Sequence, residues 1–100
     1  MRWLRPRAKE PPVARDASDE VRFYFYFEDE ETARWAASVL EGKGYGVEVN
    51  APREGILEWG VQATGVPEAE DLEEADEALR PWAARLGGEY DGHEIRLDLS

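Results

Sequence analysis

Apolar and polar residues alternate along four separate stretches of the chain. The strongest is Val21–Phe27, where every second residue is apolar and the residues between them are Arg22 and two tyrosines. A period of two places successive side chains on opposite faces of a strand. Residues 45–50, 56–64 and 93–99 alternate in the same way. The third stretch is expected to turn Leu57 toward the core together with the tryptophan two residues later. The pattern therefore predicts four strands, each with one apolar face.

Two helix-like patterns separate these strands. Asp29 precedes the first and is a typical N-cap, and Gly42 is a typical stop. The second pattern is expected to begin at Pro67, a residue favoured at the first helical position. Pro81 should kink this helix or restart it near Arg80. The inward stripes comprise Ala33, Ala36, Ala37 and Leu40 in the first helix and Leu72, Ala75, Leu79, Trp82 and Leu86 in the second.

The predicted order of elements is β-α-β-β-α-β. A short connection between the second and third strands implies a hairpin, and the helical connections imply right-handed crossovers. The economical arrangement is an α+β, ferredoxin-like fold, with a four-stranded antiparallel sheet and both helices on one face. The other face is expected to be open, carrying Arg22, Tyr24, Tyr26, Glu48, Glu58, Gln62, Glu94 and Arg96.

Length and charge divide the chain into a short arm and one domain. One hundred residues suffice for a single domain. The net charge is −11, yet residues 1–15 hold five basic residues and one acidic residue, which leaves −15 on the remainder. We expect residues 1–20 to form a basic, disordered arm and residues 21–100 to form the folded domain. An acidic body argues against direct nucleic-acid binding, which normally uses a basic surface.

Several classes of chemistry find no support in the sequence. The chain has no cysteine, which excludes disulfides and thiolate metal sites and favours a reducing, cytoplasmic setting. His93 is the only histidine and is expected to be a hydrogen-bonded residue on the core side. No nucleophile motif or phosphate loop is present, and no apolar run reaches the length of a membrane span. We therefore expect no catalytic residue, no metal, no cofactor and no membrane contact.

Two groups of residues are candidates for interaction. Tyr24 and Tyr26 on the open sheet face could stack RNA bases, contact a protein or a second copy of the chain, or simply cover the sheet. Acidic residues crowd the second helix, either as a solvated face or as a surface that docks on a basic protein. These acids are Glu68, Glu70, Asp71, Glu73, Glu74, Asp76 and Glu77, of which Glu70, Glu73, Glu74 and Glu77 are the chosen interaction candidates.

Three stretches resemble one protein family. They are residues 23–27 followed by acidic residues, residues 44–49, and residues 86–94. The last is the most specific, because helix capping alone does not require its Gly-Gly-Glu-Tyr-Asp-Gly run. Together they resemble the ribonuclease E regulator B (RraB-like) family over residues 21–94. The motif residues are Gly87, Gly88, Glu89, Tyr90, Asp91 and Gly92.

The resemblance implies a ferredoxin-like, non-enzymatic bacterial protein. Such a protein would bind a ribonuclease E/G-type endoribonuclease and inhibit or modulate RNA cleavage. The resemblance transfers no catalytic residue, and it leaves Tyr90, Asp91 and Gly92 with a structural role in a turn. The alternative hypothesis is a self-associating or small-ligand-binding module that uses the open sheet face around Tyr24 and Tyr26.

Overall fold

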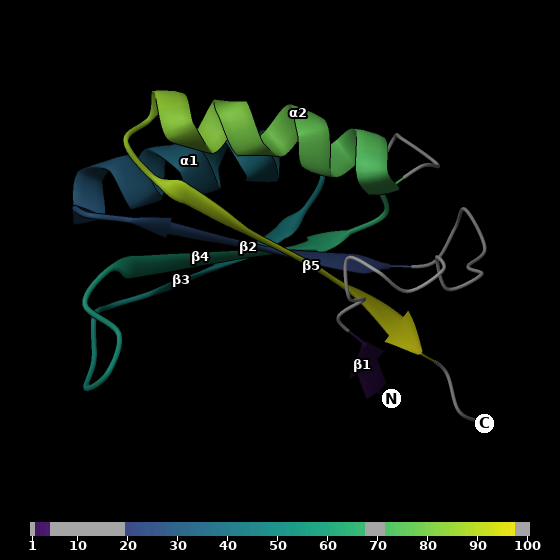
Figure 1. Ribbon diagram of the computed structural model, residues 1–100, viewed down its shortest axis with the longest axis horizontal. Helices are drawn as coiled ribbons and strands as arrows, with labels where there is room; N and C mark the ends of the chain where they lie inside the picture. The colour runs from purple at the N-terminus through teal and green to yellow at the C-terminus, as the bar shows by residue number, and fades with distance from the viewer. Residues whose placement is uncertain (1, 5–19, 68–71, 98–100) are drawn as a thin grey trace.

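The fold is a single antiparallel sheet with two helices packed on one of its faces (Figure 1). A computed structural model describes residues 2–4, 20–67 and 72–97. Within these residues the sheet order is β1-β5-β2-β4-β3. The elements are β1 (Arg2–Leu4), β2 (Val21–Phe27), α1 (Glu30–Gly42), β3 (Gly46–Asn50), β4 (Trp59–Gly65), α2 (Leu72–Arg85) and β5 (Glu89–Leu97).

The elements from β2 to β5 form the predicted ferredoxin-like arrangement. Their order along the chain is β-α-β-β-α-β, and each pair of neighbouring strands is antiparallel. Both helices lie on the same side of the sheet, so the opposite face carries no helix (Figure 1). The α+β prediction is confirmed.

A fifth strand was not predicted. Arg2–Leu4 form β1, which pairs antiparallel with the end of β5 through Arg2–Leu97, Trp3–Arg96 and Leu4–Ile95. The sequence predicts no regular structure in residues 1–20, and a three-residue strand is too short to give a recognisable period. Residues 5–19 of the arm lie outside the described residues.

The centre of the core is the apolar face of β2. Burial alternates strictly along this strand, and Val21, Phe23, Phe25 and Phe27 are all buried. α1 covers them with its predicted stripe, which is also buried. The side chain of Asp29 caps α1, because its Oδ2 accepts the Thr32 backbone N–H at 2.9 Å and its carboxylate also accepts the Thr32 hydroxyl. The predicted strand, cap and inward stripe are confirmed.

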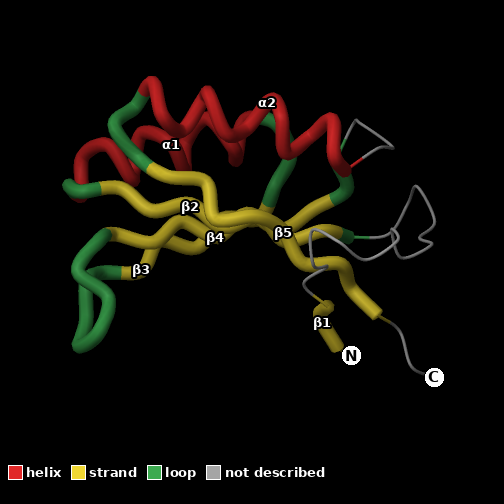
Figure 2. The backbone as a smooth tube through the Cα atoms, viewed as in Figure 1, coloured by secondary structure: helices red, strands yellow, loops and turns green. Residues whose placement is uncertain are grey.

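The connection between β3 and β4 is longer than predicted. β4 begins at Trp59 rather than at residue 56, because pairing with β3 ends at Asn50–Gly60. Ile56 belongs instead to an isolated bridge with Arg53, in which each backbone N–H donates to the other's carbonyl at 2.8 Å. Leu57 is therefore beyond the paired strand and 86% exposed, so its predicted core position is wrong. Figure 2 shows this loop extending away from the helices.

α2 also departs from the expectation. Pro67 is buried but is not helical, and the helix in the described residues begins at Leu72. Pro81 lies inside α2, which continues to Arg85 without a restart. Proline removes one hydrogen bond of the helical ladder. The helix is held on both sides of it, because Leu79 and Trp82 pack against the core and Ala83 is fully buried.

β5 begins four residues earlier than predicted because it contains a bulge. Its register with β2 shifts between Tyr24–Gly92 and Phe25–Tyr90, which leaves Asp91 as the extra residue. Gly92 has φ +106°, a backbone conformation that glycine adopts without strain. The extra residue breaks the period of two, so only the part after it, from His93, alternates recognisably. Residues 98 and 99 of the predicted strand lie outside the described residues.

Candidate interaction surfaces

The outer face of α2 carries three of the predicted interaction residues. Glu73, Glu74 and Glu77 are exposed, and Glu70 lies outside the described residues. At the acidic start of α1, the Glu30 carboxylate accepts a hydrogen bond from the Arg34 Nε at 2.9 Å. We call Glu73, Glu74 and Glu77 the acidic face of α2.

The two predicted tyrosines lie on the sheet face that carries no helix. Tyr24 and Tyr26 are half-buried, because neighbouring strands flank them on both sides. Burial raises the pKa of the Tyr24 hydroxyl, and the nearby Glu94 carboxylate raises that pKa further, while Arg22 acts in the opposite direction. Beside this tyrosine the face therefore carries one cation and one anion, whereas a surface that binds RNA phosphates is normally cationic.

The rest of the predicted open face is only partly assembled. Glu48 is exposed in β3, and Gln62 is half-buried opposite Tyr24. Glu58 precedes β4 and lies in the long loop, so its predicted place within a strand is wrong. A small cavity of about 90 Å³ lies beside Tyr24 and Tyr26, where loop residues approach the sheet.

The Gly-Gly-Glu-Tyr-Asp-Gly run joins α2 to the sheet. The backbone N–H of Gly88 donates to the Ala83 carbonyl at 2.9 Å and closes the end of α2. A Cβ at Gly88 would lie 2.3 Å from the Phe27 ring and 2.6 Å from the Tyr26 carbonyl oxygen, so no side chain fits there. The remaining motif residues, from Glu89, begin β5 and contain its bulge. The expected turn at Tyr90–Gly92 is thus a bulged strand.

The bulge places Tyr90 and His93 on the same face of β5. Tyr90 pairs with Phe25 and His93 with Phe23, and both phenylalanines point into the core. Without the extra residue, side chains three positions apart would point to opposite faces. The ring centroid of Tyr90 lies 5.2 Å from that of Phe25, and the ring centroid of His93 lies 6.3 Å from that of Phe23.

Asp76 of α2 joins these two residues. Its Oδ1 accepts a hydrogen bond from the Tyr90 hydroxyl and lies 2.8 Å from His93 Nδ1. The side chains of His93 and Asp76 are 12% and 22% exposed, so this polar cluster is largely shielded from water. The predicted hydrogen bond of His93 is confirmed, whereas Asp76 does not belong to the solvated acidic face.

Asp76 is the residue that sequence reasoning missed. The sequence places it in the acidic run of the second helix. It nevertheless lies four positions after Leu72 and next to Ala75, on the inward stripe. Positions i and i+4 lie on the same side of a helix. A carboxylate on an apolar stripe requires a polar partner when it is buried. The position of Asp76 on the inward side of the helix is therefore the feature of the sequence that could have predicted its buried hydrogen bonds.

An Asp–His pair can serve as a general base, but a substrate must be able to reach it. Neither the cavity beside Tyr24 and Tyr26 nor a larger one on the helix side of the sheet is lined by Asp76, Tyr90 or His93. The same residues contain no group of three or more carboxylate and histidine side chains placed to hold a metal ion. The cluster is therefore a set of polar contacts that joins α2 to β5.

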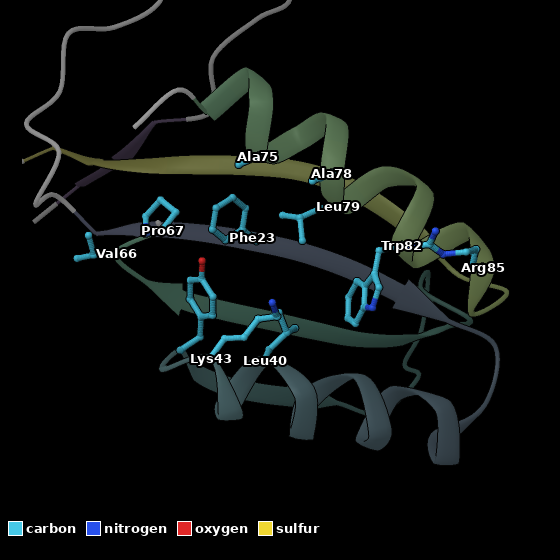
Figure 3. A pocket seen from close by; sticks show the side chains of 11 residues that line it. Phe23, Leu40, Lys43, Val66, Pro67, Ala75, Ala78, Leu79, Trp82 and Arg85 are labelled. Atoms are coloured by element: carbon cyan, nitrogen blue, oxygen red, sulfur yellow. The ribbon is translucent and has the colours of Figure 1, made fainter. Parts of the chain in front are cut away.

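The larger cavity lies between the two helices, above β2 (Figure 3). It has a volume of about 340 Å³. The sequence does not predict it, because its wall comes from three elements, from the segment between α1 and β3, and from the segment that follows β4. The lining residues are Phe23, Leu40, Lys43, Tyr45, Val66, Pro67, Ala75, Ala78, Leu79, Trp82 and Arg85.

No helix in the described part of the chain combines the length and apolar character needed to cross a membrane. The arrangement is instead that of a ferredoxin-like α+β domain with an acidic helical face and a helix-free sheet face. The chain belongs to the family described as Regulator of ribonuclease activity B (RraB), whose model matches residues 12–95. This match confirms the resemblance seen in the sequence. No curated protein and no solved structure matches the chain.

Proposed function

We propose that the chain is a non-enzymatic regulator that binds a ribonuclease E/G-type endoribonuclease in the bacterial cytoplasm and inhibits or modulates RNA cleavage. The family match carries this proposal, because it covers residues 12–95 and the family's description is regulation of ribonuclease activity. The acidic composition is compatible with a protein partner and unfavourable for direct contact with RNA.

The acidic face of α2 is the docking surface that charge favours. An endoribonuclease must hold RNA phosphates, and proteins do so with lysine and arginine side chains. Glu73, Glu74 and Glu77 present carboxylates on one exposed helix, where they could approach such a cationic surface. Electrostatic complementarity of this kind accelerates encounter and fixes orientation.

The direct test uses the purified chain and a purified ribonuclease E/G-type enzyme from the same organism. We expect the enzyme to be retained on the immobilised chain at low salt and released at high salt, since salt screens exposed charges. We also expect slower cleavage of a labelled RNA when the chain is added. No retention at low salt, together with an unchanged cleavage rate, would refute the proposal.

A pair of double variants locates the docking surface. Glu74→Gln with Glu77→Gln removes two charges from the acidic face of α2, and we expect weaker retention. Glu54→Gln with Glu58→Gln removes two charges from the exposed β3–β4 loop and serves as the matched control. Equal weakening by both pairs would mean that only overall charge matters. A loss confined to the control pair would assign docking to the loop instead.

Self-association through the open sheet face remains the alternative. Sedimentation of the wild-type chain and of Tyr26→Asp separates the two ideas, because a charge placed on the helix-free face would disrupt an apolar contact there. A wild-type dimer that becomes monomeric in the variant would support the alternative. Two monomers would exclude it.

A further inference from the structure

We propose that the cavity between α1 and α2 binds a small amphipathic anion, that is, an apolar body of about eight carbons with one carboxylate. This activity would be additional to the regulation of a ribonuclease and does not depend on it. The cavity lies on the helix side of the sheet, so it is also distinct from the open face around Tyr24 and Tyr26.

The walls of the cavity are suited to an apolar body. α1 contributes Leu40, α2 contributes Leu79 and Trp82, and Phe23 of β2 forms the floor (Figure 3). The volume of about 340 Å³ falls within the range of roughly 300–1,000 Å³ that is usual for small-molecule sites. Such sites are mostly apolar, with a few polar groups that fix the orientation of the ligand.

Both charged residues in the described lining of the cavity are cations. They are Lys43 and Arg85, and no carboxylate is among the described residues that line it. Two cations are an unexpected pair of charged residues at one site in a chain with 23 acidic and 12 basic residues. Lys43 extends toward the space between the helices, with Leu40 beside it (Figure 3). An anionic head group placed there would find a positive partner in Lys43 or Arg85.

A second explanation for the two cations must be separated by experiment. Lys43 is the C-cap of α1, and Arg85 is in the last turn of α2. Helix C-termini favour cations in the absence of any ligand. If that were their sole role, removing either charge would affect stability and leave ligand binding unchanged.

The probe is octanoate, titrated into the full chain by calorimetry and by NMR of the Trp82 indole N–H. We expect saturable one-to-one binding with a dissociation constant of about 1 mM or below, the range that a ligand of about ten heavy atoms reaches. 1-Octanol offers the same apolar body without the charge and should bind more weakly. Absence of saturable octanoate binding would overturn the proposal, and equal binding of octanol would overturn the assignment of an anion.

Substitutions then place the ligand. Ala78→Trp should fill the cavity and abolish binding, whereas Ala84→Trp changes an exposed alanine of the same helix that does not line the cavity and should leave binding intact. Lys43→Gln should weaken octanoate binding about 5–10-fold, the loss expected for one charge-assisted hydrogen bond. Arg53→Gln, outside the cavity, is the charge control. Binding that survives Ala78→Trp, or that responds equally to both charge variants, would contradict the proposed site.

Discussion

At the scale of single residues, the sequence predicted chemistry best where a residue's role depends on its neighbours along the chain. The cap at Asp29 and the inward phase of His93 both follow from local pattern, and both are present. The partner of His93 is Asp76, which is 17 residues away. A contact of that separation depends on how α2 packs on the sheet, and the strand bulge that brings Tyr90 to the same carboxylate cannot be deduced from alternation.

The Asp76 cluster should contribute measurable stability. Tyr90→Phe removes the hydroxyl that donates to Asp76 and should lower the free energy of unfolding by about 1–2 kcal/mol, because a shielded carboxylate loses one hydrogen bond. Urea denaturation of Tyr90→Phe, Asp76→Asn and the double variant completes a cycle. Additive losses would show that the hydroxyl and the carboxylate do not interact.

Gly88 should tolerate no side chain. Gly88→Ala places a Cβ against the Phe27 ring and the Tyr26 carbonyl, and we expect a loss of about 2–4 kcal/mol, since overpacking against backbone cannot be relieved by a side-chain rotation. The matched control is Gly42→Ala, because a Cβ there would meet nothing within 4 Å. Thermal unfolding of both variants checks this, and similar melting temperatures would contradict it.

The cap of α1 should make stability depend on acid pH. The Thr32 backbone N–H, and then its hydroxyl, lower the pKa of the Asp29 carboxyl below its usual value of 3.8. The folded state therefore favours the ionised form, and the cap stabilises fully above that value and is lost as the pH falls through the lowered pKa. Asp29→Asn should consequently lose less stability than the wild type between pH 6 and pH 3, as followed by urea midpoints.

At the scale of elements, the helices and strands with an uninterrupted period were predicted almost to their ends. β2 and α1 are examples, because each has one continuous apolar face. The predictions are wrong where a strand interrupts its own alternation of side chains, or where a loop alternates as a strand would. Leu57 continues the alternation of β4 into a loop that has no strand partner. Alternation in the sequence reflects only the types of side chain, whereas a strand also needs a neighbouring strand that pairs with its backbone N–H and C=O groups.

Pro81 offers a way to strengthen α2. Pro81→Ala should restore one hydrogen bond in the helical ladder and raise the free energy of unfolding by about 1–3 kcal/mol, given the low helix propensity of proline. Pro52→Ala in the β3–β4 loop is the control and should be neutral or slightly destabilising, because it only increases the freedom of the unfolded chain. Chemical denaturation of both variants tests the contrast, and a destabilised Pro81→Ala would refute it.

At the scale of the whole molecule, the basic and acidic parts of the chain meet at a different point from the start of the buried core. The buried core in the described residues begins at Val21 and draws on β2, α1, β4, α2 and β5. Residues 1–15 contribute a net charge of +4 against −15 elsewhere. The arm therefore carries much of the positive charge, while its described residues contribute a strand at the sheet edge.

A fragment of residues 21–100 should fold without the arm. It retains every residue of the core cluster, so we expect cooperative unfolding and unchanged far-ultraviolet circular dichroism. Loss of β1 should lower the melting temperature by only a few degrees, in proportion to a few lost hydrogen bonds. A fragment without cooperative unfolding would show that the arm is part of the domain.

The bulge in β5 has a consequence for insertions and deletions during evolution. Asp91 is the extra residue that shifts the alternation of side chains between the two halves of β5. In the later half, His93 and Ile95 therefore lie on the buried side. Deleting this exposed residue would leave a regular strand in which Gly92 follows Tyr90, so His93 and Ile95 would keep their faces. Adding a residue after it would instead exchange the two faces of everything that follows, turning Glu94 inward and Ile95 outward. Substitution at Asp91 leaves that alternation intact. The segment can therefore lose this residue or change its identity without altering which side chains of β5 face the core, but it cannot gain a residue.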